Sequence, residues 1–211
     1  MSLTVLLPFL VTCLIIEITP GPNMAYLAVL SASEGRKAGF AATTGIATGL
    51  LIIGVAAALG IATLISTSPL AYQILRWGGV AYLLWLAWDA WREEAQAISG
   101  KTNNTVYPTK FFRRGLIVNI LNPKAAVFYV AILPKFIVPA SSAITQAITL
   151  TIIYVMIATT IHSLLVLLAG TAQIFLEDSK RRMVARRILS LALVAIAIWF
   201  ASTTGTSESY S

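Results

Sequence analysis

The sequence predicts an all-α integral membrane fold of six transmembrane helices, arranged as two inverted three-helix repeats whose first and fourth helices are broken at proline. Three observations predict this fold. Of the 211 residues, 58% are hydrophobic and 11% are charged, whereas about a quarter of the residues in soluble domains are charged. Polar clusters divide the apolar sequence into runs long enough for helices of about 20 residues, the length that spans a bilayer. A proline-containing interruption occurs at matching places in the two halves.

We expect a single membrane domain over residues 1–211, because a chain of this length has room for about six spans and for no separate soluble domain. Its parts are a first repeat, a cytoplasmic loop, a second repeat and a polar tail, at residues 1–91, 92–110, 111–201 and 202–211. The six spans are expected at residues 3–30, 39–65, 70–88, 115–133, 143–172 and 188–201. Each repeat holds an odd number of spans, so the second repeat is inverted relative to the first.

The basic residues are divided unequally between the two sides of the membrane. If the six spans alternate in direction, the first, third and fifth loops share one side. These loops hold Arg36, Lys37, Arg92, Lys101, Lys110, Arg113, Arg114, Lys180, Arg181, Arg182, Arg186 and Arg187, and the loops on the other side hold Lys135. The positive-inside rule makes the basic side cytoplasmic, so both termini are expected outside. Contact with anionic lipid accounts for the net charge of +7, so nucleic acid is not an expected partner.

The segment 19–23, with the sequence Thr-Pro-Gly-Pro-Asn, interrupts the first apolar run. Pro20 and Pro22 lack the backbone N–H groups that would bond the carbonyls of Ile16 and Ile18, so a helix is broken here. Irregular backbone near the middle of a bilayer is tolerated only where protein buries it or water reaches it. The break is therefore a candidate site.

The fourth span repeats this design at residues 119–125. Pro123 frees the carbonyl of Asn119, and Asn122 followed by Pro123 is a favourable start for a new half-helix. Inverted halves with broken helices at matching positions are typical of secondary transporters, whose substrate site lies at the membrane mid-plane between the repeats. We therefore interpret the two breaks as parts of one substrate site.

Two ionisable side chains, Glu17 and Lys124, lie beside the breaks. A charge at mid-bilayer costs roughly 2.5 to 3.5 kcal/mol, so each group needs a partner or water. Two interpretations stay open: a structural ion pair, or a shared site that substrate reaches. Lys124 and the free N–H groups of the half-helix N-termini suit a carboxylate, whereas Glu17 and freed carbonyls suit an ammonium group. The candidate substrate-binding residues are Glu17, Thr19, Pro20, Gly21, Pro22, Asn23, Asn119, Asn122, Pro123 and Lys124.

A candidate for proton coupling, besides Glu17, is His162, the one histidine of the chain. It falls near the middle of the fifth span, and histidine titrates near neutral pH. The alternative is a neutral histidine that bonds a neighbouring helix. The tyrosines in the fourth and fifth spans, Tyr129 and Tyr154, are interpreted as packing groups.

Several motifs occur in a characteristic order along the chain. They are the segment 19–24 (Thr-Pro-Gly-Pro-Asn-Met), the turn 35–39, Gly45 with Gly49, residues 119–125 and residues 133–136. In these motifs the chain resembles the LysE/RhtB family of amino-acid exporters, from residue 1 to about residue 175. The resemblance implies proton antiport of a small amino-acid substrate, such as lysine, threonine, homoserine or homoserine lactone, out of the cytoplasm across a bacterial inner membrane. The chain departs from the family pattern at Asn23, where an acid is common. The role of an acidic group in the predicted site is therefore assigned to Glu17.

Gly45 and Gly49 lie four residues apart on the second span. Small residues at this spacing favour either close helix packing or a sliding or dimer surface. A homo-oligomer is therefore left open.

Two other classes of function are less well supported. A metal-cation exporter of the same superfamily would need a cluster of ligands, and the chain has one histidine, one cysteine and a single deep acid, so we expect no metal site. An enzyme would need an activated nucleophile, but His162 and Ser163 are adjacent and point about 100° apart on a helix. We expect a transporter without a cofactor, whose partners are an amino acid, protons and membrane lipid.

Overall fold

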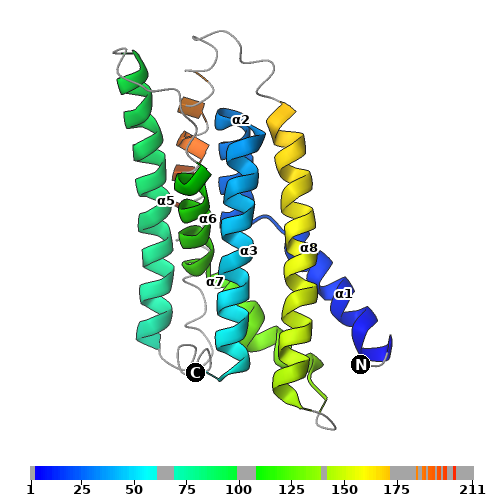
Figure 1. Cartoon of the computed structure of the whole chain (residues 1–211). Coiled ribbons are helices and arrows are strands. Elements are labelled where there is room, and N and C mark those ends of the chain that lie inside the picture. The colour runs from blue at the N-terminus through cyan, green and yellow to red at the C-terminus, as the bar shows by residue number, and fades with distance from the viewer. Residues whose placement is uncertain are drawn as a thin grey trace.

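The computed structural model describes residues 3–60, 69–98, 108–138 and 142–171, with positions 184, 187, 188, 190–192, 194, 195, 197, 198 and 202. In this part of the chain every regular element is helical, as predicted. The elements are α1 (Leu3–Ile18), α2 (Pro22–Glu34), α3 (Arg36–Ala58), α5 (Pro69–Ile98), α6 (Pro108–Ile120), α7 (Pro123–Val127), the π-helical turn η1 (Phe128–Ile132), the 3-10 turn η2 (Leu133–Phe136) and α8 (Ala143–Thr171) (Figure 1).

Two helices, α3 and α8, are each long and apolar enough to cross a membrane. Two bent pairs pass the same test together. α1 and α2 meet at 54°, and the segments Pro108–Ile120 and Pro123–Phe136 meet at 52°. The described residues thus contain two candidate spans, or up to four if each bent pair is one span. Both bends fall at the predicted proline motifs, while the predicted sixth span lies mostly outside the described residues.

α5 corrects the predicted loop at residues 92–110. The helix runs for 30 residues, to Ile98, and is not among the candidate spans. Residues 92–98 are Arg, Glu, Ala, Gln and Ile without glycine or proline, and most of these are good helix formers. The loop is also shortened at its C-terminal end, because α6 already begins at Pro108.

The helices begin and end at two opposite ends of the molecule. In Figure 1 the junction of α2 with α3, the end of α5 and the end of α8 lie at the top, whereas α1 and α8 begin at the bottom. Arg36 at the start of α3 donates a hydrogen bond to the carbonyl of Leu167 near the end of α8, at 3.3 Å. Because a helix C-terminus carries a partial negative charge, the Arg36 guanidinium stabilises the contact between the start of α3 and the end of α8.

α3 packs chiefly against α6 and α8. The approach to α6 is closest at Gly45 and Gly115, where an added Cβ would collide with the backbone carbonyls of Phe112 and Ala42 respectively. Gly49 leaves room for the side chain of Asn119, whose Nδ2 would lie 2.7 Å from such a Cβ. For these residues the structure therefore favours helix packing over a sliding or dimer surface.

Candidate functional site

The two helix breaks begin their second halves differently. Gly21 is extended (φ −157°, ψ 178°), and α2 starts at Pro22 without a side-chain cap. At the other break Asn122 Oδ1 accepts a hydrogen bond from the backbone N–H of Lys124 at 3.0 Å, which caps the start of α7. The first N–H groups of a helix have no partner within that helix. The start of α2 therefore retains backbone donors for another group.

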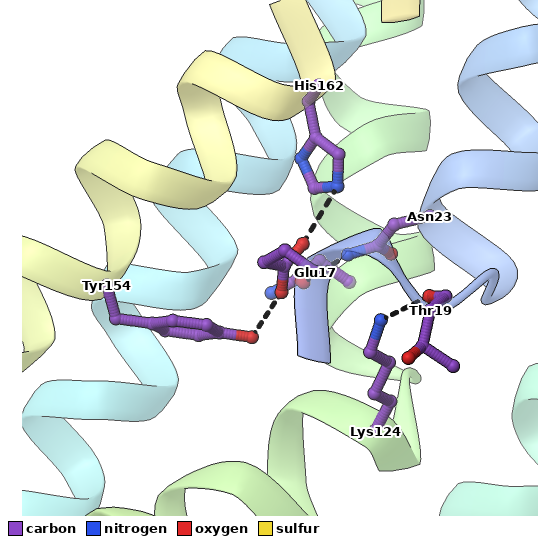
Figure 2. A network of polar contacts seen from close by, with 7 residues as sticks. Glu17, Thr19, Asn23, Lys124, Tyr154 and His162 are labelled. Carbon is purple, nitrogen blue, oxygen red and sulfur yellow. Dashed lines mark hydrogen bonds and ion pairs between the residues drawn. The ribbon is translucent and has the colours of Figure 1, made fainter. Parts of the chain in front are cut away.

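The two breaks lie against each other, and side chains of each contact the other (Figure 2). Asn23 Nδ2, in the first turn of α2, donates to Asn119 Oδ1, in the last turn of α6, at 2.8 Å. Lys124 Nζ donates to the carbonyl oxygen of Thr19 at 2.7 Å. One neutral and one charged hydrogen bond thus connect segments that are far apart in the sequence.

Lys124 contacts backbone rather than the acid. Among the described residues, Glu17 and Lys124 form no salt bridge with each other: the carboxylate pairs with His162, and the ammonium with the carbonyl of Thr19. That carbonyl lies just after the C-terminal end of α1, where the helix dipole favours a cation. The direct ion pair, which the sequence leaves open, is not formed. The expectation of a free Asn119 carbonyl is also wrong, because it accepts from the backbone N–H of Asn122 at 3.0 Å in a tight turn.

Glu17 lies at the end of the buried stripe of α1, which also contains Phe9 and Cys13. Only 5% of Glu17 is exposed. Figure 2 shows its carboxylate between two side chains of α8. Tyr154 donates from its hydroxyl to Oε1 at 2.5 Å, and His162 Nε2 lies 3.3 Å from Oε2. The His162 contact has an ion-pair distance without the alignment of a hydrogen bond.

These side chains enclose a small cavity. Its polar wall is formed by Glu17, Asn23, Asn122, Lys124, Tyr154 and His162, and the rest by Gly21, Met24, Leu50 and Ala125. The cavity volume is about 10 Å³, which is close to the minimum for one water molecule. The structure is therefore a closed form, and an amino acid can enter only if the surrounding helices move.

Five of the predicted substrate-binding residues do not line this cavity. Thr19 contributes its carbonyl to Lys124 from an exposed position, and Pro20 is exposed. Pro22 lines a second small cavity beside α5 and α6. Asn119 is fully buried behind Asn23. The remaining one is Pro123, which is buried at the start of α7.

Several buried polar atoms at the site have no hydrogen-bond partner within the described chain. They include Asn23 Oδ1, Asn119 Nδ2 and both ring nitrogens of His162. Such atoms are costly to bury, at about 1–3 kcal/mol each. Of these residues, Asn23 and His162 line the cavity, and Asn23 Oδ1 and His162 Nδ1 can offer themselves to a bound molecule, whereas His162 Nε2 already lies 3.3 Å from Glu17.

Tyr154 is the polar cavity residue that sequence reasoning misses, because the sequence alone favours a packing role for it. A tyrosine hydroxyl buried in an apolar span needs a partner, and that signal was available at residue 154. The spacing along α8 did not reveal that the partner would be Glu17. Leu50 and Met24 carried no signal, because apolar residues are expected throughout a span.

The comparisons with known proteins place the chain in a family. The family model described as LysE type translocator matches residues 14–204. The chain belongs to the LysE family. No solved structure matches this LysE-family chain.

Curated relatives of this LysE-family chain include named efflux proteins. The homoserine/homoserine lactone efflux protein of Salmonella typhimurium is 34% identical over 138 residues, covering 65% of this chain and 67% of the relative. The leucine efflux protein of Salmonella choleraesuis is 35% identical over 130 residues, 61% of each chain. An uncharacterized membrane protein of Vibrio cholerae is 32% identical over 139 residues, covering 66% of this chain and 68% of the relative.

Proposed function

We propose that this LysE-family protein exports neutral amino acids or their derivatives from the cytoplasm in exchange for protons. The named functions of its relatives, efflux of homoserine, homoserine lactone and leucine, support this class of substrate. The observation that carries the proposal is the closed cavity between two broken helices, which holds one carboxylate and one ammonium group.

The cavity offers complementary groups for the two ends of an amino acid. Glu17 and the free Oδ1 of Asn23 are acceptors for a substrate ammonium. Lys124 and the uncapped start of α2 are donors for a carboxylate, because a helix N-terminus favours negative charge. A bound carboxylate would compete with the Thr19 carbonyl for the Lys124 ammonium.

The rest of the cavity wall favours a neutral substrate side chain. Met24, Leu50 and Ala125 present apolar surface. Glu17 is the one acid among the described residues that line the cavity, and the substrate's α-ammonium would occupy it. A lysine substrate would bury a second ammonium without a carboxylate, which is costly. Leucine, threonine and homoserine avoid this cost.

Glu17 can couple export to protons because one group would serve two ligands. A proton that enters from outside neutralises the carboxylate and releases the substrate's ammonium group. His162 lies 3.3 Å from the carboxylate and can exchange that proton with it. Deprotonation toward the cytoplasm would restore the binding form.

The membrane arrangement proposed here is six spans in two inverted repeats, with both termini outside the cytoplasm of a bacterial inner membrane. The two bends of 54° and 52° support it, because inverted repeats with paired broken helices are typical of transporters. The excess of basic residues in the odd-numbered predicted loops, the first of which joins α2 to α3, supports the orientation. A homo-oligomer remains compatible with this arrangement.

The experiment uses purified protein in proteoliposomes loaded with labelled leucine or homoserine. An inward proton gradient should accelerate efflux from the vesicles. Glu17→Gln should lower gradient-driven efflux at least about tenfold and remove its dependence on the gradient. A tenfold loss of rate corresponds to about 1.4 kcal/mol of lost transition-state stabilisation. Glu34→Gln, at an acid outside the cavity, is the matched control and should transport normally. A Glu17→Gln protein that responds to the gradient like the parent would rule out the coupling role.

A further inference from the structure

We propose that Tyr154 is a positioning residue that couples Glu17 to an aromatic closure on the outer side of the cavity. This inference rests on the proposed export function. The term aromatic closure means the connected rings of Phe9, Phe128, Tyr129, Phe136 and Tyr154.

The aromatic closure joins the three segments that would have to separate if a substrate left on that side. Phe9 belongs to α1, Phe128 begins η1, and Tyr154 belongs to α8. The Tyr154 and Phe128 rings stack with centroids 3.7 Å apart, and Phe9 lies 6.2 Å from Phe128. Phe9 also packs edge-on against Phe136 at 5.2 Å. All of these rings except Phe136 are 0–1% exposed, so the closure is dry.

The direction of α1 places the aromatic closure between the cavity and the outer end. Phe9, Cys13 and Glu17 follow one another along the same buried stripe. Phe9 precedes Glu17 by two turns of helix, a rise of about 12 Å. α1 begins at the end of the molecule opposite to the basic junction of α2 and α3 (Figure 1). In the proposed orientation this end faces outside.

Tyr154 belongs to both the closure and the site. Its ring stacks on Phe128, and its hydroxyl donates to Glu17 Oε1 at 2.5 Å. A hydrogen bond to an ionised carboxylate is about twice as strong as one between neutral groups. A proton or a substrate ammonium on Glu17 would weaken the hydrogen bond from the Tyr154 hydroxyl to the carboxylate. The Tyr154 ring could then separate more easily from the Phe128 ring.

The backbone beneath Phe128 and Tyr129 is adapted to rearrangement. Both residues lie in the π-helical turn η1, between α7 and the 3-10 turn η2. π-helical turns are uncommon and occur frequently at functional sites. Three short helical segments in succession can change their hydrogen bonding more readily than the continuous α8 can. We therefore expect η1 to move, with α8 as the fixed wall.

The chain carries its own reporter of this opening. Cys13 is the single cysteine, and it is fully buried between Phe9 and Glu17 on α1. A membrane-impermeant, charged methanethiosulfonate added to right-side-out vesicles can reach Cys13 only when the closure opens. The labelling rate at Cys13 thus measures the closure without measuring transport.

The experiment compares parent, Tyr154→Phe, Glu17→Gln and the double variant. Tyr154→Phe keeps the stacked ring and loses the hydroxyl, so labelling from outside should rise about tenfold or more, the worth of a hydrogen bond to a charged group. Glu17→Gln should raise it similarly, and the double variant should label no faster than the quicker single variant, because both act through one contact. Tyr82→Phe removes a hydroxyl from a ring that is stacked on Trp85 and belongs neither to the site cavity nor to the aromatic closure, and this variant should label like the parent.

Two outcomes would overturn the coupling. One is a Tyr154→Phe rate equal to that of the parent. The other is an equal rise in inside-out vesicles, which indicates general loosening. If Tyr154→Phe fails to reach the membrane, Phe128→Leu replaces it, tests the stacked partner directly and carries the same expectation. If export is normal and the Cys13 labelling rate of Tyr154→Phe is unchanged, only this inference is refuted. If labelling rises as expected in a protein that transports no amino acid, only the proposed function is refuted.

Discussion

At the scale of single residues, the position of Lys124 explains how a cation is accommodated in the middle of a bent helix pair. Its ammonium donates to the Thr19 carbonyl at 2.7 Å, just beyond the C-terminal end of α1. The dipole of α1 favours a cation at this end, while the cap by Asn122 satisfies the N–H at the start of α7. Lys124 is therefore held without Glu17, which leaves the carboxylate available to other partners.

Lys124→Met is the prediction that belongs to this residue. If the ammonium binds the substrate carboxylate, the KM for efflux should rise by roughly 10- to 100-fold, the worth of a hydrogen bond to a charged group. Labelled leucine in proteoliposomes measures it. Lys135→Met, an exposed lysine outside the cavity, is the control and should leave KM unchanged.

The same residue permits a sharper comparison with Glu17. Since the two side chains form no salt bridge, the double variant Glu17→Gln with Lys124→Met should not regain the activity that either single variant loses. Restoration of transport in the double variant would show that the two groups act as a structural pair and would contradict the assignment of Lys124.

Sequence reasoning about the site reached the residues whose chemistry is local. Prolines break helices wherever they occur, and a charge in an apolar run needs a partner, so Pro22, Glu17 and Lys124 could be found by inspection. The identity of the partners could not, because it depends on how α8 is rotated against α1. Tyr154 meets Glu17 through that rotation, and no spacing within either helix encodes it.

At the scale of elements, α3 owes its close approach to α6 to glycine. Gly45 and Gly115 allow backbone to pack on backbone, and in membranes such packing substitutes for the hydrophobic effect. The sequence indicated small residues at this spacing but left their partner open. The extent of α5 was misjudged for a different reason: apolar content marks where a span ends, whereas a helix continues as long as its residues favour it.

Gly45→Ala tests this packing. The added methyl group would meet the carbonyl of Phe112, so the two helices must separate, at a cost of about 1–3 kcal/mol. The temperature of unfolding in detergent should fall. Gly78→Ala on α5 is the control, since its Cβ would make only an ordinary contact, 3.6 Å from Leu121, and its better helix propensity should hold or raise that temperature. Equal effects of the two substitutions would contradict the close approach.

At the scale of the whole molecule, the charge distribution of the sequence supports the proposed orientation in the membrane, and ring packing supports a closed end of the site. Arg36 and Lys37 begin α3 at the end of the molecule where α8 ends, and Arg36 donates a hydrogen bond to the carbonyl of Leu167 in α8 there. The aromatic closure lies toward the opposite end. In the proposed orientation, the rings that meet around Phe128 would close the site on the outer side, which is the form expected of an exporter that waits for cytoplasmic substrate.

Reporter fusions test that orientation for the molecule as a whole. Alkaline phosphatase folds into its active form only outside the cytoplasm, so a fusion after Ser211 should be active, while a fusion after Ile98 should be inactive. Fluorescent-protein fusions at the same two positions should give the opposite pattern, and this guards against poor expression. The physical reason is the positive-inside rule, since Arg36, Lys37 and Arg92 precede the second fusion point and lie in loops assigned to the cytoplasm. An inactive phosphatase after Ser211 with an active one after Ile98 would invert the molecule. The aromatic closure would then face the cytoplasm. The proposed directions of substrate export and of proton entry to Glu17 would have to be reversed as well.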